Sequence, residues 1–447
     1  MPVPTPISIR ARFGYTLWQI LIGLYNALIT LYIIGVLLAN RTWKIGRDAR
    51  RKAFRTYDPV RPLKVGIVSE YYYPHLGGLS GDVHYAAVEF AKMGYAVKLI
   101  TSHVAEPHNI RHSEFGFEIL RVGRSIPVFA NGSLAKISFA WNLGRQVKKL
   151  IREQKFDVIH IHCPLTPVLP LLVQRYADCP VIGHIHTLLR TKPFYYKIFS
   201  SQLARFMADF EGRIAISKVC ARPFQEWFNC DFEIIPNGVP VDEFKEFHPK
   251  IPHFDDGKTN LFFIGRMEPR NGISVLIDAF RIIHAEEPDT RLILAGAGPL
   301  KSFFEESIED DLKPHVHFIG PILEEKAQYF ATADINICPT TRVASLGVTL
   351  LESLASGKPT VASDIPAFRE TAENGRDLLM AHPDTPEEFA AQTLRLIREP
   401  TLGQLLAKRG QLKMQKFYSW SLIISKVDVY TNQVLGRLSS FEKLQSV

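Results

Sequence analysis

The stretch from Ser345 to Pro359 (SLGVTLLESLASGKP) carries the strongest chemical pattern in this 447-residue chain. The pattern predicts a turn that opens into a helix and ends at a glycine. Gly347 would let a ligand approach the backbone closely, and the free N–H groups of Val348 and Thr349 would then face an anion such as a diphosphate. Glu352, about one and a half turns further on, could reach a pair of sugar hydroxyls. Taken alone, the stretch fits an ordinary capped helix of an α/β domain equally well.

Histidines occur in two pairs that could bind a metal ion. His160 and His162 are two residues apart in a run that predicts a strand, as are His184 and His186, so each pair shares one strand face. No carboxylate or thiolate pattern accompanies them, and the chain has no Asp-x-Asp pair. The five cysteines lack a C-x-x-C spacing, which indicates neither a zinc site nor a disulfide framework. We expect no metal and no cofactor, although ligation by the histidine pairs stays open.

Two other stretches match nucleotide-binding loops only in part. Residues 257–259 (GKT) could end a phosphate-binding loop, but Pro252 stands where its first glycine belongs, and a predicted strand follows. Gly296 and Gly298 lack the third glycine of a dinucleotide-binding fingerprint. The sequence therefore shows neither the phosphate-binding loop nor the dinucleotide-binding fingerprint that would indicate a kinase or a dehydrogenase.

Strands and helices must position these residues, and the hydropathy pattern predicts both. Short apolar runs, typical of strands buried on both faces, alternate with amphipathic helices such as 83–93, 273–283 and 386–398, and a Gly-rich loop covers 77–80. The predicted strands are 65–68, 96–101, 158–161, 181–185, 213–216 and 232–235, then 261–264, 291–294, 315–319, 334–338 and 360–362. They predict an α/β fold of two doubly wound Rossmann-like domains, joined near 240–258, with a ligand cleft at the carboxyl ends of their strands.

The charge of the chain is concentrated at its N-terminus. The formal net charge is +8, and residues 1–60 carry +7 of it through nine basic and two acidic groups. The remaining residues are almost neutral, so the folded part shows no sign of the basic face that nucleic acid requires. We expect no nucleic-acid partner.

An uncharged apolar stretch precedes most of these basic groups. Between Arg12 and Arg41 lie 28 uncharged residues. As a helix they would extend about 42 Å, more than the roughly 30 Å of a bilayer core, so we expect a membrane-spanning helix. The basic residues after it predict an inner or plasma membrane location with the following domains in the cytoplasm. A polar stripe that includes Gly23 and Asn26 leaves two alternatives open: helix packing, including a homo-oligomer formed through this helix, or a helix lying in the membrane interface.

Several motifs together resemble a known family. In the second predicted domain they are 263–272 (FIGRMEPRNG), 294–299 (LAGAGP), 345–359 and 362–369 (ASDIPAFR). In the first they are 73–78 (YPHLGG), 157–162 (DVIHIH), 184–187 (HIHT) and 235–239 (IPNGV). Over residues 62–435 the chain resembles family 4 retaining glycosyltransferases of the GT-B fold, and in detail the phosphatidylinositol mannosyltransferases and related lipid glycosyltransferases.

The resemblance implies a role for each matched residue. Gly77 and Gly78 would let the first loop approach the donor diphosphate, and His186 would lie beside the reacting sugar. Arg266 would offset the charge that develops on the leaving phosphate. Donor binding would also involve Gly298, Gly347, Val348, Thr349 and, at the ribose, Glu352. The implied mechanism is a metal-free front-side substitution with retention, in which the leaving diphosphate assists the incoming hydroxyl.

Two positions depart from the family pattern. Ala344 stands where the first of two glutamates eight residues apart usually lies, so only Glu352 remains. Asn271 stands where a lysine commonly precedes the glycine that ends the Arg266 segment. The glutamate would orient donor-sugar hydroxyls, and the lysine would stabilise the diphosphate. Arg270 is an adjacent cation that could replace the lysine.

Basic and aromatic residues alternate shortly after His186, at Arg190, Lys192, Phe194, Tyr195, Tyr196 and Lys197. Such a patch suits a membrane surface or an anionic lipid headgroup. An ordinary solvated helix face fits the same pattern. Near the C-terminus, residues 418–420 (YSW) and the amphipathic helix after them resemble the final helix of the family, which returns to the first domain.

The sequence therefore predicts a membrane-anchored retaining hexosyltransferase that faces the cytoplasm. Its donor would be a nucleotide diphosphate sugar, GDP-mannose first or a UDP-sugar, and its acceptor a lipid or lipid-linked molecule such as phosphatidylinositol. The alternative is a catalytically degenerate nucleotide-sugar-binding protein with a regulatory or scaffold role. The predicted parts are an anchor and basic linker (1–61), an acceptor-side domain (62–250), a nucleotide-sugar-binding domain (251–417) and the returning helix (418–447).

Overall fold

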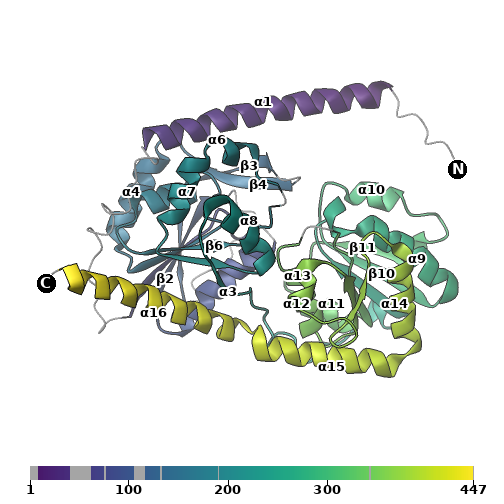
Figure 1. Ribbon diagram of the computed structural model, residues 1–447. Coiled ribbons are helices and arrows are strands. Elements are labelled where there is room, and N and C mark those ends of the chain that lie inside the picture. The colour runs from purple at the N-terminus through teal and green to yellow at the C-terminus, as the bar shows by residue number, and fades with distance from the viewer. Residues whose placement is uncertain are drawn as a thin grey trace. The chain divides into compact units, whose positions relative to one another are not determined.

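The computed structural model describes residues 9–40, 62–74, 77–104, 116–130, 133–189, 191–341 and 344–445, and its strands form two sheets (Figure 1). Contacts divide the chain into two compact units. The first unit holds Met1–His184, Phe199–Gly212 and Phe441–Val447, and the second holds Ile185–Ile198 and Arg213–Ser440. The predicted α/β class with strands alternating with helices is confirmed.

The first sheet has eight strands in the order β4-β3-β2-β1-β5-β6-β7-β8. Near its middle, β1 (Lys64–Val68) pairs in parallel with β2 (Ala96–His103) and with β5 (Val158–His162). Beyond β5 lie β6 (Val181–Ile185), β7 (Gly212–Ala215) and the two-residue β8 (Glu233–Ile234). Every residue of β5 and β6 is buried, which explains why most residues of these strands are apolar.

A β-hairpin at the edge of this sheet was not predicted. β3 (Glu118–Ala130) continues the parallel sheet beside β2, and β4 (Ser133–Phe139) returns antiparallel to β3. Arg121 and Arg124 interrupt the apolar pattern of β3, so the sequence shows no buried run there. The first sheet is therefore mixed and not wholly parallel.

Helices accompany the strands of the first sheet as the alternating pattern predicts. They are α3 (Gly78–Lys92), α4 (Leu143–Gln154), α5 (Leu169–Tyr176), α6 (Phe194–Ile198), α7 (Ser200–Ala208) and α8 (Lys218–Phe228). α3 begins at Gly78, so most of the predicted Gly-rich loop at 77–80 is the first turn of a helix.

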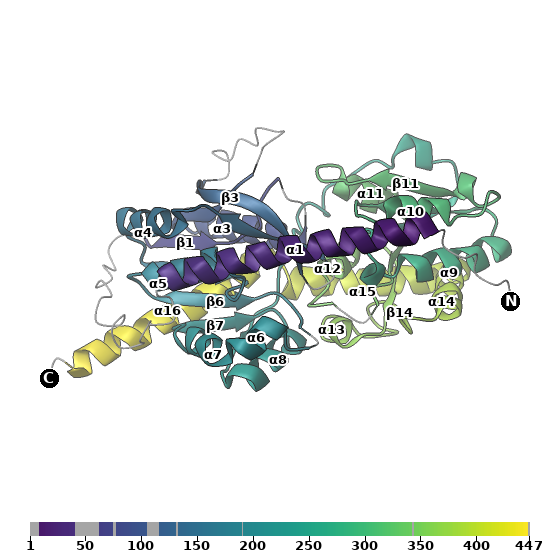
Figure 2. The same ribbon diagram turned by 90° about the horizontal axis from the view of Figure 1, so that it is seen from above.

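The N-terminal helix α1 (Ile9–Ala39) lies along the hairpin of the first unit (Figure 1). The Tyr25 hydroxyl donates to the Pro127 carbonyl at 2.8 Å, and the Tyr32 and Phe139 ring centroids are 4.5 Å apart. At its C-terminal end, near α4 and α5 (Figure 2), Asn40 accepts a hydrogen bond from the Tyr176 hydroxyl at 2.6 Å. Among the described residues, no helix has both the length and the hydropathy that crossing a bilayer requires, so the predicted membrane-spanning helix is not supported.

The second sheet has six parallel strands in the order β11-β10-β9-β12-β13-β14. These strands are β9 (Thr259–Ile264), β10 (Thr290–Ala295), β11 (Val316–Gly320), β12 (Ile335–Cys338), β13 (Thr360–Ser363) and β14 (Leu379–Ala381). The first five match predicted strands, whereas β14 was not predicted. This strand order is that of a doubly wound nucleotide-binding fold, so the second predicted Rossmann-like sheet is confirmed.

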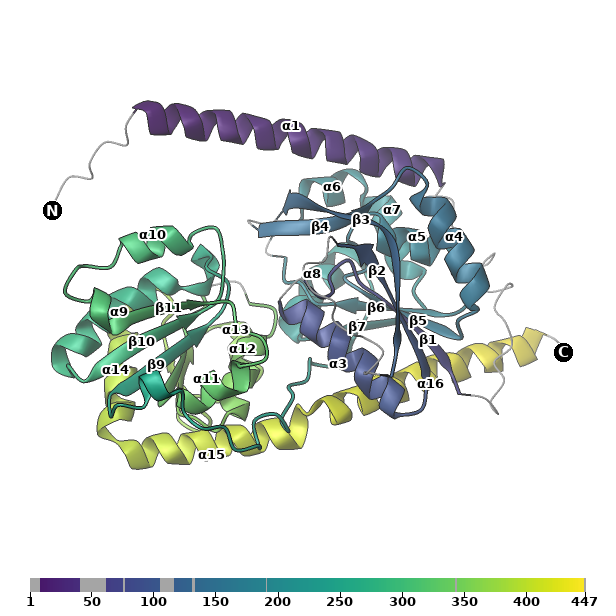
Figure 3. The same cartoon turned by 180° about the vertical axis from the view of Figure 1, so that it is seen from behind.

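Helices cover both faces of the second sheet (Figure 3). Leu261 and Phe263 of β9 belong to the core formed with α9 (Ile273–Glu286) and α14 (Pro386–Arg398). Phe262, which points to the opposite face, stacks on Tyr329 of α11 (Lys326–Thr332), where α12 (Val348–Ala355) and α15 (Pro400–Phe417) also pack. The predicted helix at 386–398 has the bounds observed for α14.

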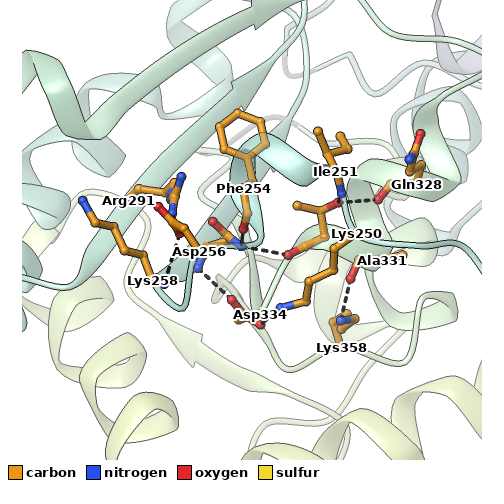
Figure 4. A network of polar contacts seen from close by, with 12 residues as sticks. Lys250, Ile251, Phe254, Asp256, Lys258, Arg291, Gln328, Ala331, Asp334 and Lys358 are labelled. Atoms are coloured by element: carbon orange, nitrogen blue, oxygen red, sulfur yellow. Dashed lines mark hydrogen bonds and ion pairs between the residues drawn. The ribbon is translucent and has the colours of Figure 1, made fainter.

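A polar network fixes the segment that enters the second sheet at the amino ends of its strands (Figure 4). Asp334 accepts hydrogen bonds from the backbone N–H of Asn260 at 2.8 Å and from Lys250 Nζ at 3.1 Å. The Asn260 side chain donates through Nδ2 to the Phe254 carbonyl at 2.9 Å, and Arg291 pairs with Asp256. The network lies at the amino ends of the strands, and the predicted ligand site lies at their carboxyl ends.

The last helix, α16 (Trp420–Gln445), follows α15 after a short break. Within the second unit, the Val239 N–H donates to the Tyr418 carbonyl at 2.8 Å, and the indole of Trp420 lies against Gly238. The Arg213 N–H donates to the Tyr430 hydroxyl at 3.1 Å. The segment 235–239 and the YSW segment, both singled out in the sequence, therefore contact each other.

Candidate functional site

The strand order of the second sheet changes direction at β9, with β10 on one side and β12 on the other. In doubly wound sheets the loops that follow two such strands diverge and leave a crevice at the carboxyl ends, where ligands bind. The loop after β9 carries Arg266, and the loop after β12 leads to Gly347. The two loops touch, since the Thr341 N–H donates to the Arg270 carbonyl at 2.9 Å.

Arg266 is held by a buried carboxylate that the sequence analysis did not identify. Glu268 is 3% exposed, and its Oε1 lies 2.6 Å from Arg266 Nη2. Its Oε2 accepts a hydrogen bond from Arg270 Nε at 3.0 Å. One carboxylate therefore fixes two half-exposed guanidinium groups at this edge of the sheet, which makes the region suited to an anion.

Asn271, the position where the family commonly has a lysine, has a structural contact in this chain. Its Nδ2 donates to the Arg266 carbonyl at 2.7 Å. The side chain thereby ties the short 3-10 turn Pro269–Asn271 to the backbone of Arg266. The departure from the family pattern thus stabilises the loop that carries Arg266.

Gly298 lies in the loop after β10, the strand next to β9, and packs against this same Arg266 loop. A Cβ atom at Gly298 would lie 2.5 Å from the Met267 carbonyl oxygen, a distance that real side chains do not adopt. The Met267 N–H donates to the Ala297 carbonyl at 3.0 Å. Only glycine therefore allows the 296–298 segment to pack against the Arg266 loop.

Gly347 is the N-cap of α12 and has the left-handed φ of 87°, which favours glycine. A Cβ atom here would overlap the ring of Phe368. No side chain caps this end of α12, so the first N–H groups of the helix, those of Val348 and Thr349, point out of its N-terminus. The predicted turn and helix are confirmed, and the end of α12 has the form of an anion-binding site.

Glu352 is buried on α12 and is paired with a lysine that the sequence analysis did not consider. Its Oε1 lies 2.5 Å from Nζ of Lys326, at the first turn of α11. The ion pair fixes the carboxylate of this fifth residue of α12 against the start of α11. Glu352 can therefore present oxygen acceptors to sugar hydroxyls, the role predicted for it.

The histidine pairs come together on adjacent strands. His160 Nδ1 and His184 Nε2 are 2.9 Å apart, and the rings of His162 and His184 stack with centroids 4.6 Å apart. Complete burial lowers the pKa of His160 to about 3, so this ring stays neutral. Ring nitrogens of His162, His184 and His186 lie within 4.8 Å of one another, which makes this group the one that could hold a metal ion among the described residues. Metal independence stays a prediction.

The remaining predicted residues are placed as follows. Gly77 precedes α3 in the first unit, and a Cβ atom there would meet no atom of the described residues within 4 Å. In the predicted acceptor patch, Lys192 Nζ lies 5.6 Å from the centroid of the Phe228 ring, and Lys197 is exposed. Tyr196 is buried against Trp227 and Phe228, so it belongs to the core and not to a surface patch. Arg190 and the side chains of Phe194 and Tyr195 lie outside the described residues.

Comparison with known families gives two matches that together cover most of the chain. Residues 76–243 match the family described as Glycosyltransferase Family 4. Residues 258–399 match the family described as Glycosyl transferases group 1. Each match falls on one of the two sheets.

Two curated relatives match this chain over most of their length. A phosphatidyl-myo-inositol mannosyltransferase of Mycobacterium tuberculosis (strain H37Rv) is 30% identical over 370 residues, covering 82% of this chain and 95% of the relative. An alpha-monoglucosyldiacylglycerol synthase of Streptococcus pneumoniae is 25% identical and covers 68% and 72%.

Among solved structures, Anabaena HepE in complex with UDP and glucose aligns with a TM-score of 0.66 at 16% identity, over 83% of this chain and 99% of that one. A glycosyltransferase from Rickettsia africae aligns with a TM-score of 0.65 at 14% identity, over 84% and 99%. These structures establish the two-domain GT-B-like fold that the sequence predicted.

Proposed function

Because the chain belongs to the family 4 glycosyltransferases, we propose that it moves a hexosyl group, mannose first, from a nucleotide diphosphate sugar to a lipid-linked acceptor such as phosphatidylinositol. The observation that carries the proposal is the switch point of the second sheet. There the uncapped N-terminus of α12 and the Arg266 guanidinium offer donors to a diphosphate. Both would act without a cofactor.

The proposed reaction retains the configuration of the sugar. The N–H groups of Val348 and Thr349 bind the diphosphate oxygens, and Glu352 binds the ribose hydroxyls. As the bond between the anomeric carbon and the leaving oxygen breaks, negative charge grows on the phosphate and Arg266 stabilises it. The acceptor oxygen attacks the same face, and its proton passes to the leaving phosphate. His186 borders the sugar, and Gly77 and Gly78 keep the role at the diphosphate that the family resemblance implies.

Relatives support the donor and acceptor classes. Mannose and inositol lipid appear in the names of relatives that the chain covers almost completely, and the streptococcal relative is named for a glycosylated diacylglycerol. HepE was solved with UDP, so a UDP-sugar stays the second choice after GDP-mannose. A lipid acceptor also fits a membrane-bound enzyme on the cytoplasmic side, the location we propose.

The apolar surface of α1 supports membrane binding. Leu24, Leu28 and Leu31 are all at least 60% exposed on the helix that lies along the β3–β4 hairpin. We expect the full chain to stay with membranes through a high-salt wash, because salt weakens charge attraction and leaves apolar burial intact. A variant with Leu28→Asp and Leu31→Asp should be released. Release of the unaltered chain by salt alone would exclude apolar anchoring.

A degenerate binding protein is the second candidate, favoured by the departures at Asn271 and Ala344. The deciding experiment measures transfer of radiolabelled sugar into membrane lipid across a panel of GDP- and UDP-sugars. We expect transfer by the unaltered chain with at least one donor, and a lower rate after Ala344→Glu because the larger, charged side chain crowds an adapted pocket. A silent chain that becomes active with Asn271→Lys and Ala344→Glu would refute the enzyme and support the binding protein.

A further inference from the structure

Three segments of the second unit meet at one residue, Ser345. Its Oγ accepts a hydrogen bond from the Leu188 N–H at 3.1 Å, and its carbonyl accepts one from the Ser217 hydroxyl at 2.6 Å. The Cys220 thiol lies 3.4 Å from the same carbonyl. Ser345 therefore joins the loop after β6, the start of α8 and the loop that leads to α12.

A second contact lies beside the first and involves Glu370, the residue that follows α13 (Pro366–Arg369). Its Oε2 accepts a hydrogen bond from the Lys218 N–H at 2.8 Å, and its Oε1 accepts one from the Val219 N–H at 2.9 Å. These N–H groups are the first two of the 11-residue helix α8. The carboxylate thus binds the positive end of a helix with both oxygens, which is a favourable place for a negative charge.

The Ser345 contacts are partly buried, and their partners at the start of α8 are buried. Ser217 is 1% exposed and Cys220 is fully buried, and burial raises the pKa of the Cys220 thiol to about 11, so it remains a neutral donor. The Ser217 hydroxyl also accepts the Cys220 N–H at 3.1 Å, as the N-cap of α8. Breaking one of these bonds would leave a buried polar group without its partner, which is costly. The junction is therefore expected to keep one geometry.

Chain connectivity gives this junction a consequence for the site. Leu188 lies two residues after His186, and Ser345 lies two residues before Gly347. The Glu370 contact reinforces the junction, because Phe368, two residues earlier, packs against Gly347. A shift of the α8 start or of the Leu188 loop would therefore change where His186 lies relative to the N-terminus of α12.

We propose that Ser345 and Glu370 are positioning residues that hold the His186 loop against the diphosphate site at Gly347 and thereby set the rate of sugar transfer. The inference rests on the proposed function and adds two residues to it. Neither side chain needs to touch the substrate. Both act through backbone groups of the segments that they bind.

The test uses the full-length protein with Ser345→Ala and Glu370→Gln. The first removes the acceptor for Leu188, and the second keeps the size of the side chain but replaces one acceptor oxygen by an amide. Matched controls are Ser425→Ala, an exposed serine whose hydroxyl donates to the Ser421 carbonyl within α16, and Glu373→Gln, whose carboxylate pairs with Arg376 at the surface. Ser345→Thr retains a hydroxyl and serves as the rescue variant.

We expect kcat to fall about tenfold in each test variant, while the Kd for the free nucleoside diphosphate changes less than twofold. The diphosphate site itself is intact in both variants, so a purely structural loss would lower kcat and binding together. Hydrogen exchange should accelerate in peptides covering 186–190 for Ser345→Ala and 216–221 for Glu370→Gln. Ser345→Thr should restore kcat, and the controls should match the unaltered chain.

Each other outcome overturns a specific statement. If exchange is unchanged, or kcat stays within twofold despite faster exchange, the positioning role is wrong. A parallel loss of kcat and diphosphate binding also overturns it, because it indicates general damage. If Glu370→Gln does not fold, Ser345→Ala alone decides by the same criteria. If the unaltered chain transfers no sugar from any donor, the proposed function fails. Hydrogen exchange in Ser345→Ala and Glu370→Gln is then still informative: faster exchange supports the junction, and unchanged exchange contradicts it.

Discussion

Replacing Glu268 by glutamine tests how Arg266 is held at the candidate site. The carboxylate is 3% exposed and lies 2.6 Å from Arg266 Nη2 and 3.0 Å from Arg270 Nε. Glu268→Gln keeps the volume and one acceptor oxygen but removes the negative charge. One charge-assisted hydrogen bond is lost, and the amide group then faces a guanidinium that also donates.

The size of the effect follows from these contacts. A hydrogen bond to a charged group contributes about 1.5 to 3 kcal/mol, and both arginines are more than 40% exposed, so solvent screening favours the lower end. We expect the free energy of unfolding to fall by about 1.5 kcal/mol. We expect kcat to fall about tenfold, because a loss of about 1.4 kcal/mol in transition-state stabilisation has that effect.

Urea unfolding and transfer rates at saturating donor measure the two quantities. Glu309→Gln is the matched control, because Glu309 also pairs with an arginine, Arg281. Glu309 is half-exposed and is not one of the residues of the candidate site. The control should change stability by less than about 0.5 kcal/mol and leave kcat unchanged. If Glu268→Gln keeps kcat within twofold of the unaltered chain, the carboxylate does not orient Arg266 for the reaction.

Three further predictions concern the same chain. His186→Ala and Arg266→Ala should abolish transfer with the fold intact, and unchanged turnover of both at saturating donor would place the chemistry elsewhere. Glu352→Ala should mainly raise the donor Kd, measured by calorimetry, and an unchanged Kd would remove the ribose contact from the proposal. Burial lowers the pKa of His160 from about 6.5 to about 3. Between about pH 6.5 and about pH 3 the imidazole is therefore protonated in the unfolded chain but not in the folded protein. The free energy of unfolding falls as the pH decreases through this range. His160→Gln should flatten that part of a urea-unfolding pH profile, and an unchanged slope would contradict the assignment.

The central strands and the α12 turn were predictable because their causes are local. Strands such as β5 and β9 are buried on both faces of the sheet, which favours largely apolar runs. Gly347 stands at the start of a helix with an unusual φ, and glycine is the residue that marks such a position in a sequence.

Other features depend on partners far along the chain. The β3–β4 hairpin carries charged residues whose partners lie elsewhere in the chain: Arg121 donates to the carbonyls of Ser102 in β2 and of Tyr73 in the loop after β1. Lys326 approaches Glu352 only when α11 and α12 lie on the same face of the sheet. Glu268 lies within a motif that the sequence analysis quoted, yet nothing in its local spacing shows that its carboxylate is buried between two arginines.

The same contacts bear on whether the departures at Asn271 and Ala344 mark a lost activity. Asn271 bonds to the Arg266 carbonyl, and the neighbouring Arg270 supplies a cation that Glu268 fixes at 3.0 Å. Positive charge is therefore present where the family commonly has a lysine, although a different residue provides it. Keeping a carboxylate buried costs free energy unless cations compensate it, and a site that had lost its anionic ligand would gain little from this arrangement. A buried glutamate that holds two half-exposed arginines supplies positive charge to this loop, so the departure at Asn271 does not by itself indicate a lost activity, and the sugar-transfer assay decides between an enzyme and a binding protein.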